Sequence, residues 1–138
     1  MIPALLFVYG TLRRLYGHPQ HAILERNSEF VGEGAIQAQL FYLGNYPGAL
    51  LSVDPSDRVL GEVYRLDGCQ ADDTLRQLDQ YEGLGQADPE ACEYRREVVT
   101  VRLGGDSMVH AWAYVLNREP QGCMRILSGD YFEWRASQ

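Results

Sequence analysis

The chain has 138 residues and a mass of 15.6 kDa, which is the size of one ordinary domain, and we expect residues 1–138 to form a single domain. Its 46% hydrophobic and 22% charged residues are typical of soluble globular proteins and argue against disordered and fibrous classes. The net charge of −7, with arginine as the sole basic residue type besides histidine, argues against a nucleic-acid surface.

The apolar run at residues 2–9 is too short to span a membrane, and it lacks the basic start and cleavage pattern of a secretory signal. We therefore expect a cytoplasmic protein without a membrane partner. Cys69, Cys92 and Cys123 are odd in number and have no Cys-x-x-Cys spacing. This pattern predicts reduced, structural thiols rather than a disulfide framework or a zinc site.

The first third of the chain predicts strands and one short helix. Residues 4–9 form an apolar run that ends at a glycine, which is typical of a strand leading into a turn. Residues 13–27 are compatible with a loop and a short helix. Residues 30–43 alternate roughly and predict either one long bent strand or a strand pair, with a bulge at Gly32 or Gly34.

The middle of the chain predicts two strands, each entered through a turn. Residues 45–48, with the sequence Asn-Tyr-Pro-Gly, give a turn signal before a short strand at residues 49–53. A second turn at residues 54–57 leads to residues 59–66, whose side chains alternate well enough for a strand.

The remaining segments predict a helix, a hairpin and a closing turn. Residues 72–83 form the one strongly helical segment, with acids in its first turn and a glycine at its end. Residues 94–103 and 109–116 read as a β-hairpin, and residues 126–134 as a short helix or turn. Many short strands, one clear helix and fourteen glycines favour an α+β fold, a small mixed β-barrel with peripheral helices.

Glu82 stands where a carboxylate is least favoured. Leu75, Leu78 and Glu82 fall at i, i+3 and i+7, so the carboxylate shares a face with the leucines that dock the helix. It also lies in the predicted last turn, where the helix dipole opposes negative charge. Both effects raise a carboxyl pKa toward neutrality, which suits general acid/base catalysis. The alternative is an acid that reaches solvent or pairs with an arginine.

The second candidate is the turn after the first predicted strand, which includes Tyr9, Gly10, Thr11 and Leu12. Successive backbone amides at such a turn can bind an anion or stabilise an oxyanion, and a glycine lets a ligand approach closely. An ordinary glycine turn explains the same residues.

Other chemistry finds little support. His18, His21 and His110 have no acidic or cysteine partner at metal-ligand spacing, so no metal site is predicted. Motifs for nucleophilic catalysis and phosphate binding are absent from the sequence, and we expect no cofactor. The nine tyrosines suit either a pocket for a small polar substrate or the core.

Taken together, an ordered set of short motifs resembles the gamma-glutamylcyclotransferase-like family, and most closely its gamma-glutamylamine cyclotransferase-like branch. The resemblance runs from Phe7 to about Asp130. The motifs are Phe7-Val8-Tyr9-Gly10-Thr11-Leu12-Arg13, Tyr46-Pro47-Gly48-Ala49, Gly61-Glu62-Val63-Tyr64, Leu78-Asp79-Gln80-Tyr81-Glu82-Gly83, Tyr94-Arg95-Arg96 and Ala113-Tyr114.

The resemblance implies a small mixed barrel whose first loop binds a γ-glutamyl group through the backbone of Tyr9 to Leu12. It implies that Glu82 is the catalytic residue and that Tyr94 and Tyr114 line the pocket. The segment at residues 15–17 departs from this branch, which often has a glycine directly after the basic pair. The loop that frames the leaving group is therefore expected to differ.

The activity that the resemblance implies is release of 5-oxoproline and a free amine from a small γ-glutamyl substrate. Glu82 would take a proton from the α-amine, which attacks the γ-carbonyl of the same molecule. Two alternatives stay open: a non-catalytic module that keeps the pocket for a small acidic ligand, and a structural barrel that serves as an oligomeric interface. The substrate, the leaving amine and the oligomeric state are left open.

Overall fold

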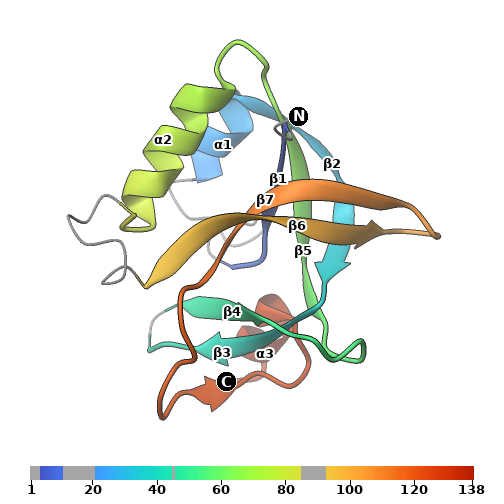
Figure 1. Ribbon diagram of the computed structural model, residues 1–138, viewed down its shortest axis with the longest axis vertical. Coiled ribbons are helices and arrows are strands. Elements are labelled where there is room, and N and C mark those ends of the chain that lie inside the picture. Colours follow the sequence, from blue (N-terminus) through green and yellow to red (C-terminus); the bar gives the residue numbers. More distant parts are fainter. Residues whose placement is uncertain (1–3, 11–20, 45, 85–92) are drawn as a thin grey trace.

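The computed structural model describes residues 4–10, 21–44, 46–84 and 93–138 (Figure 1). Within these ranges it contains a closed five-stranded barrel, a separate three-stranded sheet and three short helices. The predicted α+β fold, a small mixed barrel with peripheral helices, is confirmed. No helix in the described ranges has the length and apolar character needed to cross a membrane.

The barrel is closed by one parallel strand pair. Its strands follow the order β1-β5-β2-β6-β7, and β7 pairs with β1 in parallel while the other pairs are antiparallel. Because β1 has a partner on both sides, the first strand lies inside the sheet. The strands are β1 (Leu5–Val8), β2 (Ser28–Ile36), β5 (Val59–Leu66), β6 (Tyr94–Leu103) and β7 (Met108–Leu116).

The second sheet has the order β4-β3-β8 and is antiparallel. It consists of β3 (Ala38–Tyr42), β4 (Pro47–Leu51) and β8 (Met124–Arg125). The segment at residues 30–43 is therefore a strand pair divided between two sheets, and the pairing register of β2 shifts between Phe30 and Gly32, beside one of the two glycines predicted to mark a bulge. The two-residue strand β8 was not predicted, because two residues are too few to show alternation.

The predicted turn at residues 45–48 is partly wrong, because Pro47 and Gly48 already belong to β4. Pro47 opens a strand at the edge of its sheet, where a residue without an N–H group is tolerated. Gly48 is required by packing: a Cβ there would lie 2.6 Å from Cδ2 of Leu116. Gly48 thus lets β4 pack closely against Leu116 at the end of β7.

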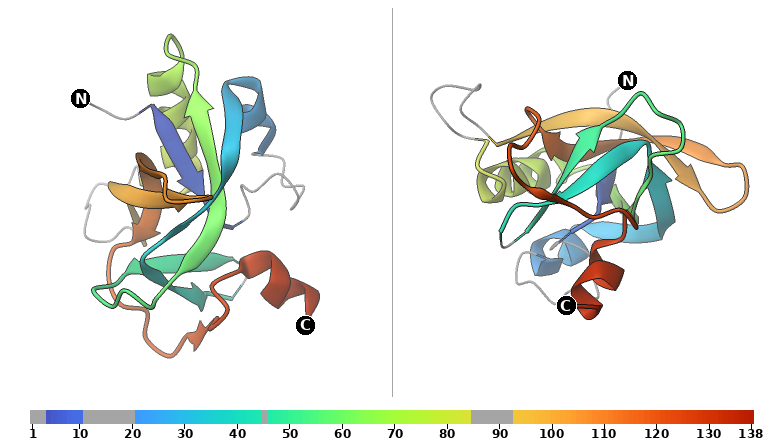
Figure 2. Two further views of the ribbon diagram at one scale, coloured as in Figure 1. Left: turned by 90° about the vertical axis from the view of Figure 1, so that its right-hand side faces the viewer. Right: turned by 90° about the horizontal axis from the view of Figure 1, so that it is seen from below.

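The helices are divided between two ends of the molecule. In Figures 1 and 2, α1 (His21–Arg26) and α2 (Ala71–Tyr81) lie at one end of the barrel, and α3 (Tyr131–Ala136) lies at the other end beside β3 and β4. The predicted helix at residues 72–83 corresponds to α2, which begins one residue earlier and ends two residues earlier. The predicted short helix near the end is α3, whose first turn is capped by the carboxylate of Asp130.

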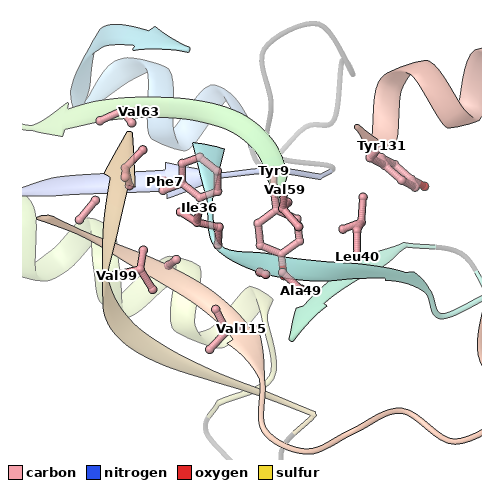
Figure 3. Packing of buried hydrophobic residues seen from close by; sticks show 14 of the residues in the cluster. Phe7, Tyr9, Ile36, Leu40, Ala49, Val59, Val63, Val99, Val115 and Tyr131 are labelled. Carbon is pink, nitrogen blue, oxygen red and sulfur yellow. The ribbon is translucent and has the colours of Figure 1, made fainter. Parts of the chain in front are cut away.

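Two buried clusters occupy opposite faces of the strands. On β1, Leu6 and Val8 belong to the cluster that includes Leu75 and Leu78 of α2. Burying each of these leucines contributes roughly 2 kcal/mol to docking of the helix. The opposite face of the strands continues into the second sheet, as Figure 3 shows for Phe7, Tyr9, Ile36, Leu40, Ala49, Val59, Val63, Val99, Val115 and Tyr131.

Candidate active site

The C-terminal end of α2 fixes the backbone of Glu82. Gly83 has a φ of +78°, and its N–H donates to the carbonyl of Gln80 at 3.1 Å, while the N–H of Leu84 donates to the carbonyl of Asp79 at 2.9 Å. These two bonds form a Schellman motif, which requires a left-handed residue directly after the helix cap. Glu82 was predicted in the last turn of the helix; it is the C-cap, one residue beyond the end of α2 at Tyr81, and it still lies at the negative end of the helix dipole.

The carboxyl of Glu82 is partly buried and is surrounded by negative charge. Burial, followed by the charges of Glu93 and Asp79, raises the pKa of Glu82 to about 7. Within the described ranges, no arginine forms an ion pair with this carboxyl. The group can therefore exchange a proton near neutral pH, which is the property that general acid/base catalysis needs.

The three candidate tyrosines that the sequence singled out, Tyr9, Tyr94 and Tyr114, lie around Glu82. All three are buried, at 6%, 6% and 4% exposure. Burial is the largest cause that raises the pKa of each phenol above its ordinary value of 10, and the charge of Glu82 adds to it in all three. The structure thus gathers residues from the ends of β1, β6 and β7 within electrostatic reach of one carboxyl.

Two of these hydroxyls link the barrel to the second sheet. The hydroxyl of Tyr9 donates to the carbonyl of Tyr114 at 2.6 Å and accepts from the N–H of Ala49 at 3.0 Å. Figure 3 shows Tyr9 beside Ala49, at the junction of the two sheets. The hydroxyl of Tyr94 donates to the carbonyl of Pro47 at 2.6 Å. Each bond satisfies a buried hydroxyl and orients its ring.

The third hydroxyl belongs to a network centred on Asp79. The hydroxyl of Tyr114 donates to Oδ1 of Asp79 at 2.7 Å, and Arg96 donates to both oxygens through Nε at 2.8 Å and Nη2 at 3.2 Å. The guanidinium of Arg96 lies over the ring of Trp112, 4.4 Å from its centroid. Sequence reasoning gave Asp79 no role; the available signal was its position three residues before Glu82, on nearly the same side of the helix.

Arg95 and Arg96 lie side by side in the chain near the start of β6. The structure gives each arginine an internal partner. Arg96 is held by Asp79, and Arg95 donates to Glu97 at 2.7 Å and to the carbonyl of Leu116 at 2.9 Å.

Gly10 lies in the turn that follows β1 and is buried against β4. A Cβ at Gly10 would lie 2.6 Å from Cγ of Pro47, so this contact requires a glycine. The other two candidates in the turn, Thr11 and Leu12, fall outside the described residues. Gly10 therefore lies beside Pro47 at the start of β4, and the carbonyl of Pro47 accepts the hydroxyl of Tyr94.

A second acid, Glu93, lies near Glu82, and no sequence pattern pointed to it. The hydroxyl of Tyr46 donates to Oε1 of Glu93 at 2.5 Å, and this bond is the main cause that raises the pKa of Tyr46 to about 12. The ring of Tyr46 is 6.3 Å from that of Tyr94, centroid to centroid. The charge of Glu93 also raises the pKa of Glu82, so the two acids lie close to one another.

The arrangement places a carboxyl that can exchange a proton near neutral pH beside three buried tyrosines. In the part of the chain that the structure describes, no three His, Cys, Asp or Glu side chains are grouped so as to hold a metal ion.

Comparison with known proteins gives a consistent result. Residues 6–135 match the protein family described as "Gamma-glutamyl cyclotransferase, AIG2-like". The chain is also 35% identical, over 129 residues, to the gamma-glutamylcyclotransferase family protein YtfP of Escherichia coli K12, an alignment that covers 93% of this chain and 96% of YtfP.

Solved structures show the same fold. An uncharacterized protein from Pyrococcus horikoshii superposes with a TM-score of 0.66 at 27% identity, covering 97% of this chain and 94% of that one. An AIG2-like protein from mouse superposes with a TM-score of 0.67 at 25% identity, covering 95% and 89% of the two chains.

Proposed function

Because the chain belongs to the gamma-glutamyl cyclotransferase, AIG2-like family, we propose that it cyclises the γ-glutamyl part of a small substrate to 5-oxoproline and releases a free amine. The resemblance read from the sequence motifs is confirmed at the level of the family. The observation that carries the proposed reaction is Glu82, a carboxyl with a pKa raised to about 7 at the end of α2, among buried tyrosines.

In the proposed reaction, the carboxylate of Glu82 takes a proton from the α-ammonium group of the substrate. The freed amine attacks the γ-carbonyl carbon of the same molecule, and a five-membered ring forms with a tetrahedral centre. Glu82 gives this proton to the leaving nitrogen and takes the extra proton that the ring nitrogen still carries. The oxyanion then re-forms the carbonyl, the bond between that carbon and the leaving nitrogen breaks, and Glu82 passes its second proton to the released amine. Nucleophile and electrophile belong to one molecule, so the protein needs to hold a folded conformer and carry protons from one nitrogen to the other.

The remaining candidates have roles in the proposal that follow from their positions. Backbone groups at Gly10 would stabilise the oxyanion of the tetrahedral centre, since Tyr9, the residue directly before Gly10, lies near enough to respond to the charge of Glu82. Tyr9 and Tyr94 would form the wall of the pocket, because their buried rings are held by hydrogen bonds between the two sheets. Their raised pKa keeps both phenols neutral near pH 7.

The proposal is tested by incubating the purified protein with a panel of γ-glutamyl amines and γ-glutamyl amino acids and measuring 5-oxoproline. The Glu82→Gln variant keeps the shape of the side chain and cannot accept a proton. We expect its kcat/KM to fall by about a hundredfold or more on any active substrate. Equal release of 5-oxoproline by the variant and the wild type would overturn the role of Glu82.

The same panel separates the proposal from a non-catalytic binding module. Thermal stabilisation by glutamate, 5-oxoproline or γ-glutamyl amines, without any ring-closed product, would favour the module. A barrel that serves as an oligomeric interface would show neither stabilisation nor product.

A further inference from the structure

We propose that Asp79, held by Arg96 and Tyr114, is a positioning residue that keeps Glu82 in its reactive place, an inference that rests on the proposed function of Glu82. We call these three residues the Asp79 brace.

Asp79 connects α2 to the β6–β7 hairpin. Asp79 accepts hydrogen bonds from Arg96 on β6 and from Tyr114 on β7, so one carboxylate fastens α2 to both strands of the hairpin. The backbone carbonyl of Asp79 accepts the N–H of Leu84 in the Schellman motif that surrounds Glu82. A shift of Asp79 therefore moves the helix cap that carries Glu82.

The ion pair between Arg96 and Asp79 has several features that strengthen it. The side chains of Arg96 and Asp79 are each 24% exposed, so their ion pair is better shielded from water than a surface pair. It is bidentate, which adds both strength and direction. The ring of Trp112 under the guanidinium restricts the arginine further, as an arginine packed on an aromatic face loses freedom.

The ion pair also brings two opposite charges close to Glu82. Asp79 lies near enough for its charge to raise the pKa of Glu82, and Arg96 carries the opposite charge beside it. The other titratable groups that act on or respond to Glu82 come from the segments packed around it; they are Tyr9, Tyr46, Glu93, Tyr94 and Tyr114. Removing either member of the ion pair must therefore shift the titration of Glu82, and the two removals must shift it in opposite directions.

The experiment compares Asp79→Asn, Arg96→Gln and the double variant. The titration of the Glu82 carboxyl is followed by NMR in protein labelled with 13C-glutamate, and its signal is assigned by its loss in Glu82→Gln. We expect the pKa of Glu82 to fall in Asp79→Asn, to rise in Arg96→Gln and to stay near the wild-type value in the double variant, whose net charge is unchanged.

Turnover provides the second measurement. Since a displacement of about 1 Å can cost up to a hundredfold in rate, we expect kcat to fall at least about tenfold in Asp79→Asn and in the double variant, with KM within about twofold of wild type. Tyr114→Phe, which removes a single hydroxyl and keeps the ring, should lower kcat less. This mild variant keeps the test decisive if the charge variants fold poorly.

Asp57→Asn is the matched control, because Asp57 also accepts a hydrogen bond from an arginine, Arg125, on the second sheet. It should change neither the titration of Glu82 nor kcat. The brace is overturned if Asp79→Asn and Arg96→Gln shift the titration in the same direction, or if the double variant keeps wild-type kcat. A wild type without 5-oxoproline release would contradict the proposed function, whereas the NMR titration would still test the coupling.

Discussion

Two carboxylates, Asp79 and Asp57, hold the molecule together at two different places. Asp79 joins α2 to the barrel hairpin. Asp57 joins the loop before β5 to the second sheet, since it accepts from Ser52 at 2.6 Å, from Gln39 at 3.0 Å and from Arg125 at 2.8 Å. Both combine an arginine with hydroxyl or amide donors, so their chemistry is nearly the same.

The surroundings of the two carboxylates differ. Asp57 lines an open groove of about 480 Å³, and its bonds to Ser52, Gln39 and Arg125 lower its own pKa. Asp79 lies three residues before Glu82, a partly buried acid, and the negative charge of Asp79 helps to raise the pKa of Glu82. The Asp57 network therefore supports structure at a solvent-facing place, whereas the Asp79 network can also influence the protonation of a neighbouring carboxyl in a poorly solvated place.

The largest expected effect is on the acid side of the pH–rate profile. A base with a pKa of about 7 is about 1% ionised at pH 5, so kcat/KM should rise by about a hundredfold between pH 5 and pH 9. Asp57→Asn should follow the same curve as the wild type. Initial rates of 5-oxoproline release across that range test this, and a rate that is flat from pH 5 to pH 8 would contradict proton transfer by Glu82.

The second effect is on stability. Glu82 binds its proton more tightly in the folded protein than in the unfolded chain, because burial raises its pKa from 4.5 to about 7. The folded state therefore holds more protons between these values, and the free energy of unfolding should fall by up to about 3 kcal/mol as pH rises through them. Urea denaturation of wild type and Glu82→Gln at several pH values checks this. If the free energy of unfolding depends on pH equally in both proteins, Glu82 does not cause this dependence.

The third effect uses two glycines with the same backbone conformation. Gly83 and Gly105 have φ angles of +78° and +74°, and among the described residues, apart from the chain neighbours, no atom lies within 4 Å of a Cβ built on either. Replacing either with alanine should cost about 1 kcal/mol in stability. Only Gly83→Ala should also reduce turnover, several-fold, because Gly83 follows Glu82 in the helix cap. Unfolding midpoints are measured for the same variants. Matching losses of kcat in both would contradict a specific role of Gly83 beside Glu82.

The smallest effect belongs to Asp57→Asn. The pKa of Asp57 is lowered by its hydrogen bonds, so its contribution to stability is present above its ordinary pKa of 3.8 and is lost as pH falls below it. At pH 7 the Tm should fall by less than about 4 °C, and the difference from wild type should vanish in acid. Thermal unfolding at pH 7 and pH 3 measures both. A Tm difference that is larger at pH 3 than at pH 7 would contradict the expected loss of this contribution in acid.

Local patterns were enough to predict most of the fold and the central acid. Alternation located β5 and the β6–β7 hairpin, and the spacing of Leu75, Leu78 and Glu82 placed the carboxyl on the docked face of α2. The partners of the site could not be predicted in this way. Arg96 and Asp79 are 17 residues apart, and Tyr46 and Glu93 are 47 apart, so these pairs depend on how strands and helix pack in three dimensions.

The parallel pairing of β1 with β7 also has a consequence for folding. It joins Leu6 to Trp112, and the hydrogen bond from Tyr9 to Tyr114 closes a separation of 105 residues. The β6–β7 hairpin forms from neighbouring residues, whereas this pairing requires the closure of a long loop, which is entropically costly and slow. We expect β1 to remain without its second neighbour until β7 has been synthesised, so Tyr9 and Tyr114 come together beside Glu82 only in a late step of folding.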